Sequence, residues 1–288
     1  MPTKVEKDRV TGRETTGHEW DGIKELNTPL PKWWLYVFYA TIAWSVIYWV
    51  LYPSIPGITG YVHGVLGWSM REQHAEVMAE ARAAQSQYYD QIAAAELGEI
   101  RENQDLLNFA LAGGEAAFAD NCAPCHGGGG AGRPGGYPVL ADDAWIWGGS
   151  LEDIHATIQY GVRNEHAESR QSMMPAFGDI LSPDQLTDVA AYVLSLSGEA
   201  QDAKAAQRGA QVYAEQCAAC HGEDGKGMNA LGAPNLTDAI WLYGGSKEEI
   251  ISQIGNPQHG VMPPWENRLD SETVKMLTVY VHSLGGGQ

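Results

Sequence analysis

The chain has 288 residues, with 18 lysines and arginines against 36 aspartates and glutamates, which gives a formal net charge of −18. A surface of this sign repels nucleic acid, so we expect no nucleic-acid partner. It either attracts basic protein partners or is a generic solvated acidic surface. The length leaves room for two small domains and further segments. All four cysteines fall into two closely spaced pairs.

Residues 1–32 form a polar N-terminal segment with six basic and six acidic side chains, so the negative excess belongs to the rest of the chain. The uncharged run 33–52 follows. A run of about 20 apolar residues can span a membrane, and aromatic residues at both ends are typical of membrane interfaces. We predict one transmembrane helix. A buried soluble helix would rarely carry such aromatic ends, and a signal peptide would need a small-residue cleavage site, which is missing after Tyr52.

Basic residues lie mainly before the predicted span. Arg13, Lys24 and Lys32 precede it, whereas Arg71 stands alone in a comparable stretch after it. By the positive-inside rule, the N-terminus is cytoplasmic and the remainder lies on the other side of the membrane. The sequence therefore predicts a single-pass protein of a bacterial inner membrane.

Residues 53–107 form a predicted connector. Its stretch from Ser69 to Leu97 is rich in alanine, glutamate and glutamine, which predicts a helix. We interpret this helix as a solvated spacer, with packing on a partner as the alternative.

Two copies of Cys-x-x-Cys-His use all four cysteines: Cys122, Cys125 and His126, and Cys217, Cys220 and His221. Two thiols on one helical turn can each add to a haem vinyl group, and the adjoining histidine then reaches the iron. A zinc site, a redox dithiol or a disulfide would explain the cysteine pairs but not the histidine after each pair. We predict two covalently bound haem c groups, attached in the periplasm, where an extracytoplasmic compartment keeps the thiols available for haem.

The two motifs lie inside an internal repeat. Gly114 and Phe118 precede the first motif at the distances at which Gly209 and Tyr213 precede the second. A Pro-x-Leu, a tryptophan before Gly-Gly-Ser and a Met-Pro follow in both copies. Such self-similarity over units of this length indicates two copies of one small domain.

Each repeat ends in a predicted amphipathic helix, at 182–196 and at 270–284. The expected fold is all-α: one N-terminal transmembrane helix followed by two tandem domains, at 108–199 and 203–288.

Met174 and Met262 are the predicted sixth ligands of the two irons, opposite His126 and His221. Each methionine precedes a proline at the same place in its repeat, whereas the neighbouring Met173 does not. A thioether is a soft ligand that favours reduced iron, which suits an electron carrier. The competing ligands have no counterpart in the other repeat: His155, His166, His259 and Met228.

Each repeat resembles a class I cytochrome c domain. In that fold the helix before the motif crosses the C-terminal helix, with a glycine and aromatic residues at the crossing. The resemblance implies that Phe118 meets Tyr192 and that Tyr213 meets Tyr280.

The resemblance also implies that a proline carbonyl, of Pro138 or Pro234, accepts a hydrogen bond from the far nitrogen of each iron-bound histidine. Further candidates are two arginines that could pair with haem propionates or stay exposed, and two tryptophans that could wall the haem pockets or fill the core: Arg133, Arg163, Trp145 and Trp241.

The order of segments resembles the dihaem subunit III of cbb3-type cytochrome c oxidases along essentially the whole chain. Local matches lie before the span at 17–23, at its exit at Tyr52 and Pro53, in the connector at 64–67 and at the first methionine at 174–178. Some members of that family have a second N-terminal span, which this sequence does not show.

The resemblance implies that the chain accepts electrons from a periplasmic or membrane-anchored cytochrome c, basic in charge, and has no catalytic residues of its own. Electrons would pass through the monohaem cytochrome c subunit to the catalytic haem-copper subunit, which reduces oxygen and pumps protons. The oxidase could join the cytochrome bc complex.

The resemblance pairs His126 with Met174 and His221 with Met262, and we expect the C-terminal domain to receive the electron first. The alternatives are a free membrane-tethered dihaem shuttle and a dihaem peroxidase, and the peroxidase would need an iron with an open position.

Overall fold

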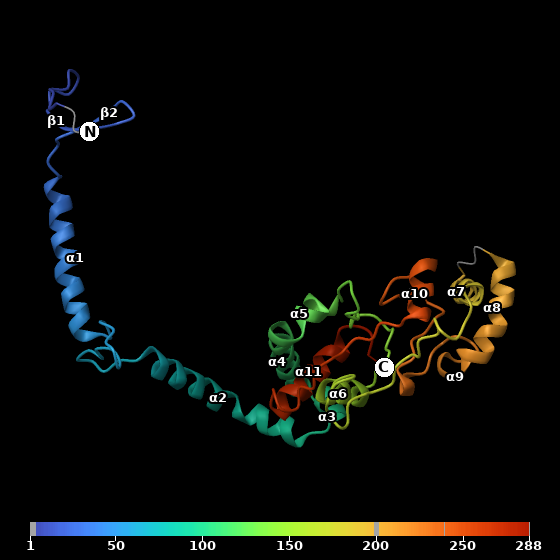
Figure 1. Ribbon diagram of the computed structural model, residues 1–288. Coiled ribbons are helices and arrows are strands. Elements are labelled where there is room, and N and C mark those ends of the chain that lie inside the picture. Colours follow the sequence, from blue (N-terminus) through green and yellow to red (C-terminus); the bar gives the residue numbers. More distant parts are fainter. Residues whose placement is uncertain (1–3, 199–201, 239, 288) are drawn as a thin grey trace. The chain divides into compact units, whose positions relative to one another are not determined.

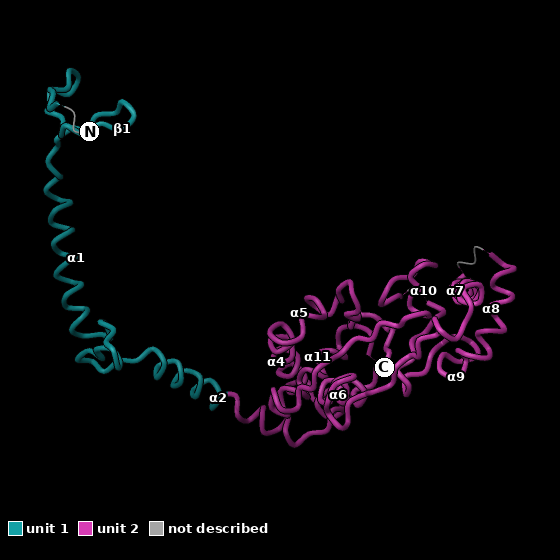
Figure 2. Tube along the Cα trace, viewed as in Figure 1, with its two compact units in different colours: residues 1–84 teal, residues 85–288 magenta. Residues whose placement is uncertain are grey.

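The computed structural model describes residues 4–198, 202–238 and 240–287. The chain divides into two compact units, Met1–Ala84 and Gln85–Gln288 (Figure 2). The second unit is mainly helical, as the sequence predicts, and the first contains helix α1 (Lys32–Leu51) and most of a second long helix. The long helix α2 (Met70–Ala94) runs across the boundary between them.

The first unit begins with a β-hairpin that the all-α prediction did not include. Strands β1 (Thr15–Trp20) and β2 (Ile23–Leu26) pair antiparallel. Asp21 and Gly22 join them, with φ angles of 48° and 83°. Two successive residues with positive φ form the tight turn that suits the twist of a hairpin. An Asp-Gly pair between short alternating segments is the sequence signal that predicts such a turn.

Helix α1 (Lys32–Leu51) coincides with the predicted span to within one residue at each end. It is apolar around its whole circumference and has no buried residue. Within the described ranges, it is the one helix long and apolar enough to cross a membrane.

The second unit contains the remaining helices. In chain order they are α3 (Leu97–Glu102), α4 (Gln104–Asn121), α5 (Ala123–His126), the 3₁₀ turn η1 (Gly128–Gly130), α6 (Leu151–Tyr160), α7 (Pro183–Leu196), α8 (Ala203–Gln216), α9 (Ala218–His221), the 3₁₀ turn η2 (Asn229–Leu231), α10 (Lys247–Gly255) and α11 (Ser271–Ser283). The six longer helices each begin after a side chain that accepts a backbone N–H: Asn103, Ser150, Ser182, Asp202, Ser246 and Asp270. These caps fix where the helices start.

The helices of the two repeats pack crosswise. Helix α4 lies against α11, from the far end of the chain, and α7 lies against α8 (Figure 1). We call α4, α5, α6 and α11 module 1, and α7, α8, α9 and α10 module 2. The core of module 1 contains Phe118, Ile154, Ile158, Val274, Leu277 and Val281. The core of module 2 contains Phe177, Val189, Val193, Tyr213, Ile250 and Ile254 among others. The repeats have therefore exchanged their C-terminal parts.

Each exchanged helix crosses its partner at a glycine. A methyl group on Gly114 would overlap the carbonyl oxygen of Met276 on α11, and one on Gly209 would overlap that of Asp188 on α7. The glycines thus permit close approach of the helix backbones, as predicted, but between different helices from those predicted.

The aromatic pairs at these crossings are also exchanged. Phe118 contacts Tyr280, with ring centroids 5.4 Å apart, and Tyr213 contacts Tyr192 at 5.0 Å. The predicted pairs, Phe118 with Tyr192 and Tyr213 with Tyr280, are wrong. Because the two repeats are similar, either C-terminal helix can fill either crossing, and sequence similarity does not distinguish the two arrangements.

Two linking segments, 161–178 and 254–263, run beside each other where the exchange occurs. Val162 and Met262 exchange both backbone hydrogen bonds, at 3.0 and 2.9 Å, and Gly178 N–H donates to the carbonyl of Gly255 at 3.0 Å. Arg163 donates to the carbonyls of Ser172 and Gly260, at 2.9 and 3.1 Å. Backbone pairing thus joins the modules.

The C-terminal end of α2 packs against module 1, which corrects the prediction of a fully solvated spacer. Ile92 is completely buried in a cluster with α3, α4 and α11, and Tyr88 stacks on Phe109 with centroids 4.8 Å apart. Lys275 Nζ donates to the carbonyls of Ile92, Ala93 and Ala95 at 2.8–3.1 Å. A cation here satisfies carbonyls that a helix end leaves unpaired.

Candidate haem-binding sites

The two Cys-x-x-Cys-His motifs each form a single helical turn. In the first, the N–H of His126 donates to the carbonyl of Cys122 at 2.8 Å, and in the second His221 donates to Cys217 at 3.0 Å. The first cysteine of each pair is half-buried and the second is exposed. Each turn therefore presents two thiols and an imidazole from one short element.

A proline carbonyl orients each histidine, as predicted. His126 Nδ1 lies 3.2 Å from the carbonyl oxygen of Pro138, and His221 Nδ1 lies 3.1 Å from that of Pro234. Because a carbonyl oxygen can only accept, the proton lies on Nδ1 and Nε2 keeps a free lone pair. Burial lowers the pKa of both histidines, and the carbonyl contact offsets part of this effect. Both rings are therefore neutral near pH 7, the form that ligates iron.

The buried cysteines favour the thiol form. Burial, with a smaller contribution from the neighbouring thiol, raises the pKa of Cys122 and of Cys217 to about 11. A reactive dithiol has a lowered thiol pKa, and burial here shifts the pKa in the opposite direction. The surroundings of these two thiols therefore argue against a reactive dithiol.

Each methionine packs in the same module as the Cys-x-x-Cys-His motif of the other repeat. Met262 packs against the core of module 1 together with Cys122, whereas Met174 packs against the core of module 2 together with Cys217. The expectation that Met174 belongs with His126 and Met262 with His221 is therefore contradicted by the packing. The exchange of C-terminal parts explains this difference. Each methionine precedes the C-terminal helix of its repeat and packs in the same module as that helix.

The two linking segments hold the methionine backbones: segment 161–178 contacts Met262, and segment 254–263 contacts Met174. The Met262 carbonyl accepts from the Val162 N–H at 3.0 Å and from Asn164 Nδ2 at 2.8 Å. The Met174 N–H donates to His259 Nε2 at 3.0 Å. No local sequence pattern marks Asn164 and His259 for these roles, since the contacts join residues 98 and 85 positions apart.

The other predicted competitors have different surroundings. Met173 is 63% exposed and Met228 is 40% exposed, whereas Met174 packs against a core. His166 pairs with Glu266 at 2.9 Å. His155 lies on α6, where burial lowers its pKa.

The arginines and tryptophans divide between surface, linker and core. Arg133 is exposed. Arg163 binds the linking segments and lies over the ring of Trp147, 5.6 Å from its centroid. Trp145 packs against the core of module 1 and Trp241 against that of module 2. The guanidinium of Arg163 is therefore engaged with protein groups.

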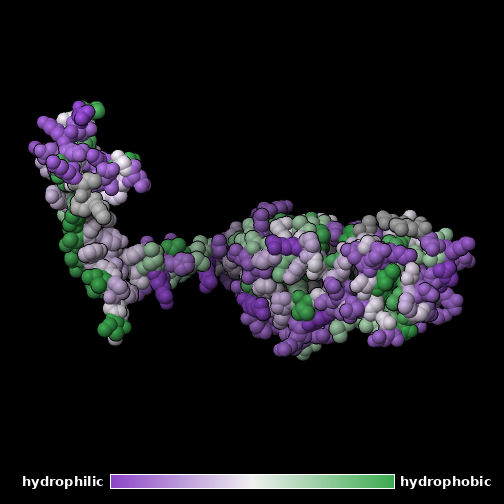
Figure 3. All heavy atoms as spheres, turned by 45° about the horizontal axis from the view of Figure 1, so that its top comes forward, coloured by the Kyte–Doolittle hydropathy of each residue, from purple (hydrophilic) through white to green (hydrophobic). Residues whose placement is uncertain are grey.

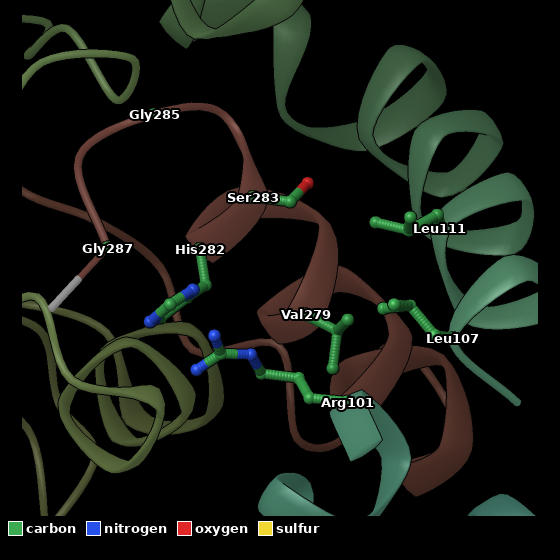
Figure 4. Close-up of a pocket in the computed structure, with 8 residues that line it drawn as sticks. All are labelled: Arg101, Leu107, Leu111, Val279, His282, Ser283, Gly285 and Gly287. Atoms are coloured by element: carbon green, nitrogen blue, oxygen red, sulfur yellow. The ribbon is translucent and has the colours of Figure 1, made fainter. Parts of the chain in front are cut away.

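A cavity of about 310 Å³ lies elsewhere on module 1, between α3, α4 and α11. Figure 4 shows the heads of Arg101 and His282 turned toward one side of it, with Leu107 and Leu111 of α4 on the other. None of the predicted haem ligands lines this cavity.

Both modules therefore have the organisation of a cytochrome c domain, built around a helical Cys-x-x-Cys-His turn and a methionine in the same apolar cluster. The family model for cytochrome c matches residues 111–197. The model for the N-terminal domain of cytochrome oxidase-cbb3, FixP, matches residues 12–59, and that for cbb3-type cytochrome c oxidase subunit III matches residues 204–281. The matches at 111–197 and 204–281 each contain one Cys-x-x-Cys-His motif, and cytochrome c domains of this kind bind haem c.

Curated relatives match nearly the whole chain. The cbb3-type cytochrome c oxidase subunit CcoP of Azospirillum brasilense is 51% identical over 292 residues, covering 98% of this chain and 99% of the relative. Subunit FixP of Azorhizobium caulinodans is 52% identical over 282 residues, covering 98% and 96%. Subunit FixP of Bradyrhizobium diazoefficiens is 48% identical over 291 residues, covering both chains fully. The chain belongs to the CcoP/FixP family of cbb3-type cytochrome c oxidase subunits, which confirms the oxidase-subunit prediction over a free shuttle.

Proposed function

We propose that the chain is a membrane-anchored dihaem subunit that accepts electrons from a cytochrome c and passes them to the monohaem subunit of its oxidase. From there electrons would reach the catalytic haem-copper subunit, which reduces oxygen and pumps protons. The similarity over the full length of the CcoP and FixP relatives carries this proposal. The chain itself contributes binding, orientation and spacing of the haems, and no catalytic residue.

Two haem c groups are proposed, because the complete motif occurs twice and each copy has the same local geometry. Haem c supplies one-electron chemistry at iron. Cys122 and Cys125 would attach one group, and Cys217 and Cys220 the other. The five predicted segments, 1–32, 33–52, 53–107, 108–199 and 203–288, remain our proposed division of the sequence, with the C-terminal parts of the last two exchanged in the fold.

The axial ligands are proposed to be crossed as well. In module 1 His126 would be opposite Met262, and in module 2 His221 would be opposite Met174. Support comes from the apolar clusters that each methionine shares with a cysteine of the other repeat.

A matched pair of double variants tests the crossing. Met174→Ala with His221→Ala removes both ligands of one iron if ligation is crossed, so half of the methionine–iron charge-transfer absorption should remain. Met174→Ala with His126→Ala should then damage both sites and abolish that absorption. Ligation in chain order predicts the reverse result for the two variants.

The anchor is proposed to be α1 in a bacterial inner membrane, with a cytoplasmic N-terminus and periplasmic haem modules. The long apolar helix α1 and the basic residues before it support this orientation. Reporter fusions after residue 30 and at the C-terminus should report opposite sides of the membrane, and equal signals would contradict the orientation.

The electron donor is proposed to be a basic cytochrome c, drawn to an acidic surface. The net charge of −18 supports this choice, and the association rate should fall as ionic strength rises. We propose that module 2 receives the electron first, since the connector packs on module 1. Rapid mixing of a variant lacking Cys217 and Cys220 should show slower electron entry. An unchanged rate would place entry at module 1.

Gentle capture of the chain from native membranes tests the function as a whole. A C-terminal tag should recover c-type haem together with b-type haem and copper, and the product should consume oxygen when reduced cytochrome c is supplied. Association with a cytochrome bc complex would appear as further b-type haem under milder detergents. A product with c-type haem alone in every detergent, and no oxygen uptake, would contradict the proposal.

A further inference from the structure

The segment that follows α1 contains no charged residue. Between Lys32 and Arg71 the chain has no Asp, Glu, Lys or Arg, although α1 itself ends at Leu51. We call residues 53–68 the exit loop. A solvated loop of this length is ordinarily polar, so its composition calls for a physical cause.

The exit loop folds back onto the last turn of α1. Val65 N–H donates to the carbonyl of Val50 at 2.9 Å, and Leu66 N–H donates to that of Leu51 at 3.1 Å. Gly64 makes this possible, because its φ is +75° and a side chain there would come within 2.5 Å of the Leu51 oxygen. The Gly-Val-Leu-Gly motif at 64–67 therefore supplies donors to carbonyls that the helix end leaves unpaired.

This pairing fixes the depth of Val65 and Leu66 relative to α1, and Ser54 Oγ, which donates to the carbonyl of Trp49 at 3.1 Å, ties the base of the loop to the same helix end. Whatever surrounds the final turn of α1 also surrounds residues hydrogen-bonded to it. The rings of Tyr48 and Tyr52 stack at 4.6 Å, and Tyr52 meets Trp68 edge-on at 5.8 Å. Tyrosine and tryptophan gather at the boundary between lipid and water, so they mark this end of α1 as the interface.

The first half of the exit loop is a small hairpin whose backbone pairs with itself. Ser54 N–H donates to the Val62 carbonyl at 3.0 Å and Val62 N–H donates to the Ile55 carbonyl at 3.1 Å. Gly57 N–H donates to Gly60 at 2.5 Å. These bonds satisfy part of the hairpin backbone, which lowers the cost of placing the hairpin at the membrane interface.

Most side chains of the exit loop are apolar, and its isoleucine, valine and leucine side chains are exposed within the first unit. Ile58, at the tip of the hairpin, is fully exposed, and Val65 is 77% exposed. Figure 3 shows the purple N-terminal end of the unit giving way to white and green along α1 and at its far end. Exposed apolar side chains on a paired backbone are suited to contact with lipid.

We propose that the exit loop is a membrane-interface element whose tip, at Ile58, inserts among the lipid acyl chains of the leaflet in which α1 ends. Lipid is the partner of these exposed side chains, because the hydrogen bonds between the loop and the end of α1 hold them beside the bilayer that α1 crosses. The proposal rests on α1 being a membrane anchor, as proposed above.

Depth-dependent quenching tests the proposal on the full-length holoprotein in lipid nanodiscs. In haem c the four native cysteines are consumed as thioethers, so a fluorophore would label only an introduced cysteine. Three variants are compared: Ile58→Cys at the tip, Ile42→Cys within α1 and Glu80→Cys on the exposed face of α2. Lipids with nitroxide groups on their acyl chains should quench the Ile58 and Ile42 probes at least twofold more than the Glu80 probe.

The controls separate the possible failures. Quenching at Ile42 but not at Ile58 overturns the exit-loop proposal and leaves the anchor intact. Loss of quenching at Ile42 overturns the anchor itself. Labelling of the unsubstituted chain would show that its thiols are free and that the haem proposal fails.

Two further measurements complete the test. Gly64→Ala should lower quenching at Ile58 towards the Glu80 value, because it breaks the contact with Leu51, while Ile42 stays quenched. In the assembled oxidase the Ile58 probe should remain quenched by lipid. Protection there from both lipid and aqueous quenchers would mean that another subunit covers the loop, and would overturn the proposal.

Discussion

Tyr213 and Phe118 occupy equivalent positions in the two repeats and differ by one hydroxyl group. Both rings are buried, and the hydroxyl of Tyr213 donates to the carbonyl of Gly222 at 2.8 Å, one residue beyond His221. Burial raises the pKa of Tyr213 from its ordinary 10.0 to about 12. Module 2 therefore contains a hydrogen bond, close to its histidine, that module 1 does not have at this position.

Tyr213→Phe should destabilise module 2 by about 1 kcal/mol near pH 8, because the Gly222 carbonyl loses its donor. A raised pKa gives stability that is complete below pH 10 and is lost as the pH rises towards 12, since the unfolded tyrosine ionises first. The variant should thus lose less stability than the original chain between pH 9 and 11. Denaturant titrations of both proteins at pH 9 and at pH 11 check this. Equal losses of unfolding free energy in the two proteins would refute it.

At the residue scale, local chemistry was predictable and long-range contacts were not. Pro138 lies 12 positions after His126, and the family resemblance predicts their hydrogen bond. His259 and Asn164 hold the methionine backbones only because the linking segments meet in the fold. No sequence pattern carried that information, because each residue lies in the opposite repeat from the methionine that it contacts.

The helix crossings of the two modules depend on small residues. Gly209 lets α8 approach α7, and the adjacent Arg208 forms two hydrogen bonds, at 2.7 and 2.5 Å, with the buried carboxylate of Asp188. The ion pair therefore tightens a contact between helices of different repeats.

Gly209→Ala should destabilise module 2 by roughly 1–3 kcal/mol, because the new methyl group overlaps the backbone of α7. Gly98→Ala on α3 is the matched control, since its methyl group meets open space. Thermal unfolding of both holoproteins provides the comparison. Gly98→Ala should be neutral or slightly stabilising, because alanine costs less conformational entropy in a helix than glycine. Equal destabilisation by both changes would contradict the role of the crossing.

Lys275 connects the end of α2 to α11. Lys275→Met keeps most of the side-chain length but removes the donor to three carbonyls, so we expect a loss of about 1.5–3 kcal/mol in local stability. Amide hydrogen exchange of residues 88–95 should accelerate accordingly. Lys204→Met, at an exposed position on α8, should leave these amides unchanged.

At the element scale, the repeat and its amphipathic patterns predicted the helices but not their partners. Helix α7 begins one residue after its expected start, and α11 ends one residue before its expected end. Their apolar faces fit either crossing, because both repeats supply a glycine and an aromatic ring there. The β-hairpin at 15–26 was missed although its Asp-Gly turn is a recognised signal.

Because the repeats have exchanged their C-terminal parts, cleavage of one peptide bond between the repeats should not separate the two modules. A protease site inserted between α7 and α8 would separate the two sequence repeats covalently. We expect the fragments to elute together in size-exclusion chromatography, because α7 stays on α8 and α4 stays on α11. Independent domains in chain order would elute as two species, and that result would contradict the exchange.

The pairing of α4 with α11 also determines the order in which the modules can fold. Lys275 meets the carbonyl of Ile92, which was synthesised 183 positions earlier, so this contact forms only after α11 has been made. Contacts so far apart in sequence are slow to form, and α4 exposes its apolar face until α11 arrives. A chain truncated before α11 would accordingly leave the first-made haem module open, although every missing residue belongs to the second repeat. During biogenesis the first site can therefore close only after a helix of the second repeat has been synthesised.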